Sequence, residues 1–195
     1  MSTGVSPVAG DPIPRERGSR DFRRVFGHFG TGVTVITTAD AEGPAGFACQ
    51  AFAPLSLDPP LVLFCPRNGS ETWRRIARTG FFCVNILASD QRDVSRLFGT
   101  PGADRFTAVE WSPAPSGAPV LAGALTWADC RLADVHPGGD HAIVTGAVTT
   151  LGRCRDIAPL LFHRSRYTTT APASPYEPPE VVDTLLSWPR HTDWI

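Results

Sequence analysis

One segment of the chain combines small residues and a lone amide in a pattern that could admit a flat ligand. Residues 46–56 contain Gly, Ala, Cys and Gln where a regular strand would carry bulky apolar side chains. Small side chains let a planar ligand approach the main chain and hydrogen-bond to its N–H and C=O groups. An irregular edge strand with a bulge fits the same composition, so both interpretations stay open at this point.

The five histidines are the next candidates for chemistry, and their spacing does not predict a metal site. None has Cys or carboxylate companions at the spacings of a zinc site. His28 and His163 are typical of core or rim positions. His141 differs because it follows a Gly-Gly-Asp turn and opens a strand-like run, where its ring could project over the rim of a barrel. We therefore take His141 as a candidate functional residue, with a turn-flanking role as the alternative.

The cysteines and the missing motifs exclude several kinds of chemistry. The five cysteines stand at least 16 residues apart, which is typical of buried thiols in a reducing compartment. All 18 basic residues are arginine, which excludes lysine Schiff-base chemistry and a phosphate-loop lysine. No G-x-S-x-G elbow occurs. The glycines of 27–32 precede a strand, whereas those of a dinucleotide-binding G-x-G-x-x-G follow one.

Charge and hydropathy limit the kinds of binding partner and the cellular location that we expect for the protein. The formal net charge is −1 and the arginines are scattered, so we expect no binding to nucleic acid. No apolar run approaches the ~20 residues that span a bilayer, and the N-terminus has no apolar signal core. We therefore expect no membrane segment and a cytoplasmic protein. With 195 residues, the chain is expected to form one domain.

The elements that must position these residues are mostly short strands, because Gly (18) and Pro (19) make up nearly a fifth of the chain. Residues 1–18 are rich in Pro, Gly, Ser and charge and are expected to form a disordered leader. Apolar residues at i, i+3, i+4 and i+7 then predict a helix from Ser19 to Phe29. The β-branched and apolar runs predict strands over 32–38, 45–56, 61–65, 81–87 and 160–167.

Two further helices are predicted from their end signals. One covers 71–78, between an N-cap at Ser70 and a terminating Gly80. The other runs from Ser89 to about Phe98.

The second half of the chain contains a long hairpin and a tail. Strand-like runs over 125–136 and 141–151 flank the turn 137–140. Residues 171–195 form a Pro-rich C-terminal extension, whose apolar end is expected to dock on its own domain or on a partner. Consecutive strands without intervening helices argue against a parallel doubly wound sheet. The domain over 19–170 is therefore predicted to be a barrel of antiparallel strands with two or three helices packed around it.

Six motifs in this domain resemble, in the same order, those of the flavin reductase family with the FMN-binding split barrel. They are Thr31 to Thr38, Gly46 to Phe52, Ser56 to Val62, Arg67 to Thr72, Phe82 to Leu87 and Gly139 to His141. The resemblance covers about residues 20–170. It implies a β-rich fold, a six-stranded antiparallel split β-barrel with flanking helices. It also implies a homodimer that binds FMN or FAD at the subunit interface.

The resemblance further implies the cofactor-binding residues. Those lining the isoalloxazine ring, largely through backbone groups, would be Gly46, Phe47, Ala48, Cys49, Gln50, Ala51 and Phe52. Ser56, Arg67 and Ser70 would face the ribityl phosphate, and a helix N-cap at Ser70 attracts an anion in any case. His141 would contact the nicotinamide, and Phe106 would close over the flavin. Cys49 and Gln50 stand where relatives commonly carry small hydroxyl residues.

The implied activity is reduction of FMN or FAD by NADH or NADPH, with direct hydride transfer from nicotinamide C4 to flavin N5. Many relatives supply reduced flavin to a separate monooxygenase. Such a reaction needs stacked rings and donors near flavin N1 and O2, so no acid–base dyad is expected. Two alternatives stay open. One is a flavoenzyme that retains its flavin and oxidises an organic substrate; the other is a non-enzymatic flavin- or haem-binding module that docks through residues 181–195.

Overall fold

The computed structural model describes residues 18–171. The expected leader over 1–18 and extension over 171–195 lie outside these residues, except for their inner ends. The described part of the chain forms three helices and three sheets, of seven, three and two strands, with antiparallel pairing throughout. The β-rich, antiparallel fold with few helices is therefore confirmed. Across these residues we find no helix long and apolar enough to cross a membrane.

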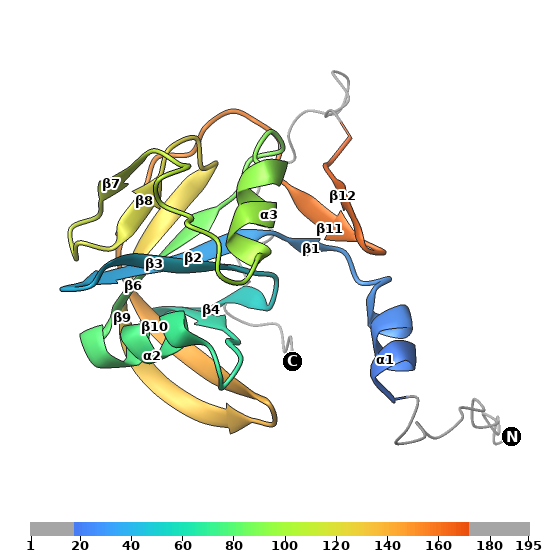
Figure 1. Ribbon diagram of the computed structural model, residues 1–195, viewed down its shortest axis with the longest axis horizontal. Helices are drawn as coiled ribbons and strands as arrows, with labels where there is room; N and C mark the ends of the chain where they lie inside the picture. Colours follow the sequence, from blue (N-terminus) through green and yellow to red (C-terminus); the bar gives the residue numbers. More distant parts are fainter. Residues whose placement is uncertain (1–17, 172–195) are drawn as a thin grey trace, which may run out of the picture.

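The seven-stranded sheet is the framework of the molecule (Figure 1). Its strands, in spatial order, are β3 (Gly43–Cys49), β2 (Thr34–Asp40), β6 (Phe81–Ile86), β9 (Thr126–Gly138), β10 (His141–Leu151), β5 (Pro60–Phe64) and β4 (Phe52–Leu57). The sheet thus has one strand more than the expected six. It is also not closed by hydrogen bonds, because β3 and β4 each pair on one side only within the described residues. These two edge strands follow each other in the chain, joined by the link Gln50–Ala51.

The sheet is strongly curved, so its two ends lie close together. Phe47 on β3 and Phe64 on β5 are separated by five strand spacings, or about 24 Å in a flat sheet. Their ring centroids are only 6.3 Å apart. The curved sheet encloses an apolar core in which the rings of Phe64 and Phe82 are fully buried, 4.9 Å apart. Residues from the two edges are thereby brought to one place.

Helix α2 (Glu71–Thr79) packs against this core through one apolar face. Trp73 and Ile76 are both buried in the core. The predicted ends are confirmed: Ser70 Oγ accepts a hydrogen bond from the Trp73 N–H at 3.2 Å, and Gly80 ends the helix with a φ of 73°. The first turn of α2 is therefore held at a fixed place beside the edge strand β3.

A second, smaller core lies on the opposite face of β2. Neighbouring residues of a strand point to opposite faces, so Ile36 enters the first core and Val35 the second. Helix α3 (Arg92–Gly99) covers the second core with the buried ring of Phe98. Both helices thus lie near β3, with α2 on one side of the strand and α3 on the other (Figure 1).

A two-stranded hairpin, β7 (Trp111–Pro113) and β8 (Pro119–Leu121), is fixed to the large sheet by buried polar side chains, among them Asn85. The Asn85 Oδ1 atom accepts a hydrogen bond from the Leu121 N–H at 2.8 Å, and its amide donates to the Val35 carbonyl at 3.3 Å. Asn85 is fully buried. The hairpin is therefore a fixed part of the fold, although the sequence analysis predicted no strand between residues 99 and 124.

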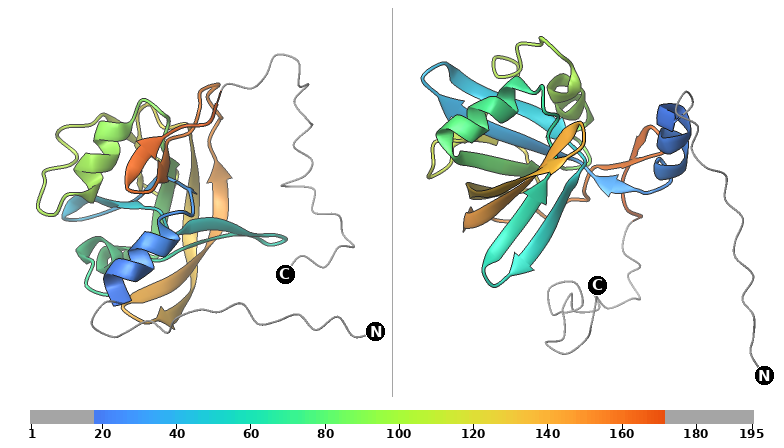
Figure 2. Two further views of the ribbon diagram at one scale, coloured as in Figure 1. Left: turned by 90° about the vertical axis from the view of Figure 1, so that its right-hand side faces the viewer. Right: turned by 90° about the horizontal axis from the view of Figure 1, so that it is seen from below.

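Helix α1 (Gly18–Phe26) stands apart from both cores, beside the three-stranded sheet (Figures 1 and 2). That sheet contains β1 (Thr31–Gly32), β11 (Leu161–His163) and β12 (Arg166–Thr168). The Arg164 N–H donates to the Gly27 carbonyl at 2.8 Å and joins the end of α1 to this sheet. The predicted apolar face is present, but in this single chain it faces solvent.

Two predicted strands are each two strands in the structure. The segment 45–56 breaks at the link Gln50–Ala51, because the chain passes there from one edge of the sheet to the other. The segment 160–167 is the β11–β12 hairpin. Its chain reverses at Arg164 and Ser165, which have φ values of 49° and 62°. Positive φ is uncommon for residues other than glycine, so the sequence carried no turn signal there.

The start of α3 also differs from the prediction. The helix begins at Arg92 rather than after Ser89, because residues 88–91 form a turn. In that turn the Gln91 N–H donates to the Ala88 carbonyl at 2.9 Å, and the Gln91 Oε1 accepts from the Ala88 N–H at 3.1 Å.

Candidate functional site

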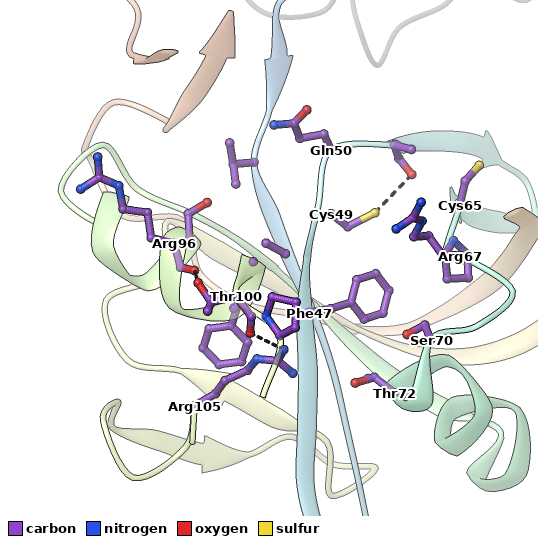
Figure 3. A pocket seen from close by; sticks show the side chains of 18 of the residues that line it. Phe47, Cys49, Gln50, Cys65, Arg67, Ser70, Thr72, Arg96, Thr100 and Arg105 are labelled. Carbon is purple, nitrogen blue, oxygen red and sulfur yellow. Dashed lines mark hydrogen bonds between the residues drawn. The ribbon is translucent and has the colours of Figure 1, made fainter. Parts of the chain in front are cut away.

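A groove of about 1230 Å³ lies where the edge strand β3 meets the starts of α2 and β10 and the end of α3 (Figure 3). Its lining includes eight of the residues that the sequence analysis selected: Phe47, Ala48, Cys49, Gln50, Ala51, Arg67, Ser70 and His141. These residues come from three separate parts of the chain. The predicted site residues are therefore largely brought together by the fold.

The wall formed by β3 presents main-chain groups to the groove. The Gly46 carbonyl accepts a hydrogen bond from Arg105 Nη1 at 2.8 Å, so it points away from the paired strand β2. Main-chain groups two residues apart on a strand point the same way, which directs those of Ala48 outward as well. β3 is an edge strand, as one of the two interpretations of this segment proposed. The same edge leaves main-chain donors and acceptors for a ligand.

Two small residues of this wall have structural reasons for their size. A Cβ atom on Gly46 would lie 2.9 Å from the Phe98 ring and 3.0 Å from the Thr37 methyl group, so packing alone requires glycine there. Cys49 is buried, and its Sγ contacts the Ala51 carbonyl at 3.5 Å. Burial raises the pKa of the Cys49 thiol to about 11, so it stays neutral and is a poor nucleophile.

The start of α2 forms an anion-binding corner of the groove. Ser70 occupies the N-cap position, and Figure 3 shows its hydroxyl and that of Thr72 on the side facing Phe47. Unpaired N–H groups and the helix dipole favour negative charge at this end. Arg67, three residues before the cap, adds a guanidinium to the same lining. The corner is therefore suited to a phosphate group.

The tip of the β9–β10 hairpin is held against this corner by main-chain bonds. His141 forms a bridge with Arg67, and the Ala142 N–H donates to the Pro66 carbonyl at 3.0 Å. The His141 Nδ1 lies 2.7 Å from the Asp140 Oδ1, and this contact holds the pKa of the Asp140 carboxyl below its usual range. The imidazole is thus held beside a carboxylate at the rim of the groove.

The opposite side of the groove comes from α3 and the loop after it, which the sequence analysis did not select. Ser95 Oγ and Tyr167 Oη share a hydrogen bond at 3.0 Å, and the Arg96 guanidinium lies 5.9 Å from the Tyr167 ring centroid. Arg105 reaches in from the loop and also donates to the Thr100 carbonyl at 2.8 Å. Arg105 directly precedes Phe106 in the sequence, but only Phe106 was selected.

Four selected residues do not line this groove. Gly46 and Phe106 line an adjoining cavity of about 540 Å³. Phe52 and Ser56 on β4 line neither cavity: Phe52 packs against the main core, and Ser56 lies where the β4–β5 register shifts. The expected grouping of Ser56 with the anion-binding corner is therefore absent within one chain.

The charges at the groove favour an anionic ligand. Three arginines line it against two carboxylates, those of Glu71 and Asp140. Arg105 forms no ion pair in the described part of the chain, and its Nε is buried without a hydrogen-bond partner. Burial lowers the pKa of Arg105. Among residues 18–171, no three His, Cys, Asp or Glu side chains are grouped to hold a metal ion.

Comparison with known proteins agrees with this geometry. Residues 26–171 match the family model of the flavin reductase like domain. The chain is 44% identical over 195 residues to the reductase subunit HsaB of a flavin-dependent monooxygenase from Rhodococcus jostii, covering 99% of this chain and 98% of the relative. A second HsaB, from Mycobacterium tuberculosis, is 50% identical over 155 residues, or 78% of this chain and 83% of that one.

Solved structures extend the similarity to three dimensions. Nitrilotriacetate monooxygenase component B from Mycobacterium thermoresistibile superposes with a TM-score of 0.81 at 46% identity, over 89% of this chain and 99% of that chain. The NADH:FAD oxidoreductase of Streptomyces globisporus, solved with NAD and FAD fragments, gives 0.79 at 34% identity, over 85% and 99%. The match to the family model covers most of this chain, and the two solved structures match it over 99% of their own length. This chain belongs to the flavin reductase family.

Proposed function

We propose that this protein is an oxidoreductase that reduces FMN or FAD with NADH or NADPH and delivers the reduced flavin to a separate monooxygenase. The main observation behind this proposal is the groove. In it, the main-chain groups of the edge strand β3 face the N-terminus of helix α2, which favours an anion. The names of the relatives support the same activity, since they include monooxygenase reductase subunits and an NADH:FAD oxidoreductase. The flavin and the nicotinamide are thus the cofactors of this reaction.

The groove fits a flavin in shape and charge. Arg67 and the N–H groups of the first turn of α2 would hold the ribityl phosphate, with Ser70 as the helix cap. The main chain around Ala48 would hydrogen-bond the edge of the ring, while the side chains of Phe47 and Cys49 stay against the core. This leaves Gln50, which is exposed, as the side chain on this wall that is free to reach a ligand.

When bound in the groove, the flavin would accept the hydride that the nicotinamide donates. The residues of the groove would bind and orient both partners, and main-chain N–H groups beside the ring would stabilise negative charge at its N1 and O2 edge. His141, oriented by Asp140 at the rim, is assigned to the nicotinamide side. None of these roles requires a nucleophile, which agrees with the neutral Cys49 thiol.

We further propose that the protein acts as a homodimer in the cytoplasm. The apolar face of α1 faces solvent in one chain, with Phe22 53% and Phe26 57% exposed. Apolar faces of this kind are normally covered by a partner. In a homodimer, Ser56, which lines neither cavity of its own chain, would be available to the partner subunit's groove. The five free cysteines are consistent with a reducing compartment.

Steady-state oxidation of NADH and NADPH tests this proposal directly. Purified protein should oxidise at least one of them only when FMN or FAD is added. Gel filtration before a visible spectrum then separates a reductase that releases flavin from an enzyme that retains it. No flavin-dependent oxidation with either nicotinamide would contradict the proposal.

The role of His141 is tested by His141→Ala. If the imidazole contacts the nicotinamide, the substitution raises the KM of the nicotinamide several-fold and changes the KM of the flavin less. His136→Ala is a suitable control, because His136 is exposed on the same hairpin and lines neither cavity. Equal changes in the KM of the nicotinamide and the KM of the flavin would contradict a contact between His141 and the nicotinamide.

A further inference from the structure

We propose that the cavity of about 540 Å³ beside the groove is a subsite for the adenosine diphosphate half of a dinucleotide. This half is shared by FAD, NADH and NADPH and is absent from mononucleotides. The inference rests on the proposed function, because it assigns the groove to the reacting rings. The proposed subsite would be the part of the protein that distinguishes dinucleotides from mononucleotides.

The two cavities adjoin at the anion-binding corner. Glu71, Thr72 and Arg105 line both of them, so these three residues form the common boundary of the two cavities. A phosphate held at the first turn of α2 would stand at this junction. The second cavity has the size of typical small-molecule sites, which are about 300–1,000 Å³. It is therefore large enough for the nucleoside that follows a second phosphate.

The far wall of the second cavity offers aromatic faces for a flat base. Phe106 and Trp111 both line it, with ring centroids 6.0 Å apart and planes inclined by 81°. Phe106 is also fixed from behind, since its ring packs edge-on against Phe98 at 5.2 Å. Trp111 is 38% exposed, an unusual position for a tryptophan that serves only packing. An adenine ring stacks on such aromatic side chains in many nucleotide sites.

Arg105 brings a positive charge to the junction and forms no ion pair in the described part of the chain, while Glu71, the carboxylate that lines both cavities, is paired with Arg74 at 3.2 Å. Arg105 donates to the Gly46 and Thr100 carbonyls, and these main-chain acceptors leave the guanidinium charge uncompensated. The Nε of Arg105 is buried and has no partner in the described part of the chain. The Arg105 side chain is half-buried and has no counter-ion in the described part of the chain, so an anion at this point would be favoured. A pyrophosphate between the two cavities supplies that anion.

Arg75, which also lines the second cavity, gives an internal comparison. Its guanidinium is paired with Asp40, at 2.9 Å between Nε and Oδ2, and bonds to the Gly43 carbonyl. Its charge is already compensated within the chain. Arg105 is thus the arginine that remains for a ligand at the junction.

The first experiment is a comparison of KM values in the full-length protein. Trp111→Ala should raise the KM of FAD about tenfold or more and change the KM of FMN less than twofold, if the flavin supplies the adenosine. If the nicotinamide supplies it, the KM of NADH rises while that of reduced nicotinamide mononucleotide, with FMN as acceptor, does not. Trp111→Phe should restore most of the affinity, because it keeps an aromatic face.

Phe81→Ala is the matched control. Phe81 is an aromatic residue with a similar exposure of 41%, and it lines neither cavity. Its substitution should leave all four KM values unchanged. If Trp111→Ala changes the KM values of dinucleotides and mononucleotides equally, the subsite is refuted. If the unsubstituted protein reduces neither FMN nor FAD, the proposed function fails instead, and the next measurement still decides the subsite.

A direct binding measurement does not depend on catalysis. Calorimetry with ADP as the probe should show binding to the unsubstituted protein and to Phe81→Ala, and a loss of about tenfold or more for Trp111→Ala. The affinity should fall as sodium chloride rises, and Arg105→Gln should weaken binding and flatten this salt dependence. ADP that fails to bind, or binds equally to Trp111→Ala, would overturn the subsite.

Discussion

Helices α1 and α2 have the same length and similar amphipathic patterns, yet the fold uses them in opposite ways. Both are nine residues long and carry an ion pair of the i,i+3 type on the exposed side. The apolar face of α2 enters the main core, where Ile76 is fully buried. The apolar face of α1 points to solvent, with Phe26 57% exposed. Figures 1 and 2 show α1 beside the small sheet, away from the core that α2 covers.

The difference shows that an amphipathic pattern predicts burial without specifying the partner. α2 finds its partner within the chain, and its buried face holds the capped first turn at the groove. α1 has no such partner in the described residues, which is why we assign its face to a second subunit. One helix therefore stabilises the site within a chain, and the other is expected to act between chains. Substitutions in the two helices should separate these roles.

The largest effect is expected from removing a core contact of α2. Ile76→Ala leaves a cavity in a fully buried position and should lower the free energy of unfolding by about 2–5 kcal/mol. Urea unfolding followed by circular dichroism measures this change. Ile76→Val, which removes one methyl group, should cost about 0.5–1.5 kcal/mol. Equal effects of the two substitutions would mean that Ile76 does not pack as tightly as the structure indicates.

The corresponding test on α1 is the double substitution Phe22→Ser with Phe26→Ser. If the apolar face is covered by a second subunit, the dimer loses about 1.5–3 kcal/mol for each buried ring, and its dissociation constant rises at least about 100-fold. Sedimentation over a range of concentrations measures this shift. Leu151→Ser is a control, because Leu151 is 73% exposed on β10. A monomeric unsubstituted protein would contradict the assignment.

Elements defined by local signals could be predicted from the sequence. The caps of α2 are at Ser70 and Gly80 because each depends only on residues within one helical turn. The long hairpin forms around the predicted turn because its two strands are adjacent in the chain. The β7–β8 hairpin and the split at 160–167 were missed, since neither the pairing of β7 with β8 nor the positive φ of Arg164 has a local signal.

The site was predicted in part, and the misses have a common cause. The resemblance to a known family supplied Arg67, Ser70 and His141, which the fold brings to one groove. Arg105 was missed because its importance depends on a tertiary property, a buried Nε without a partner. Gly46 was selected for a ligand, whereas the Phe98 ring already requires its small size. Local patterns identify residue types, but only the packing shows which atoms lack partners.

A smaller effect is expected at the cap of α2, where helix stability and anion binding can be separated. Ser70→Ala removes the acceptor for the Trp73 N–H and should cost about 1 kcal/mol of stability and raise the KM of the flavin. Ser70→Asp keeps a cap acceptor and so should keep the stability, but its negative charge repels a phosphate. The KM of the flavin should therefore rise in Ser70→Asp without a loss of stability. If Ser70→Asp binds flavin normally, no phosphate lies at this helix start.

The smallest effect concerns the ion pairs of the two helices and is limited to acid pH. The Arg75 guanidinium of α2 holds the pKa of the Asp40 carboxyl below its usual range, so the pair stabilises the fold above about pH 4 and this stability is lost as the pH falls through the lowered pKa. Asp40→Asn should therefore lower stability by a constant amount above about pH 5, and by less in acid. In α1 the exposed Asp21–Arg24 pair, at 3.6 Å, should contribute less than about 0.5 kcal/mol, so Asp21→Asn should change little at any pH. Unfolding free energies of both variants, measured in urea from pH 3 to pH 7 in roughly unit steps, test the contrast. Parallel pH profiles for Asp40→Asn and the unsubstituted protein would show that the Asp40–Arg75 pair does not anchor α2.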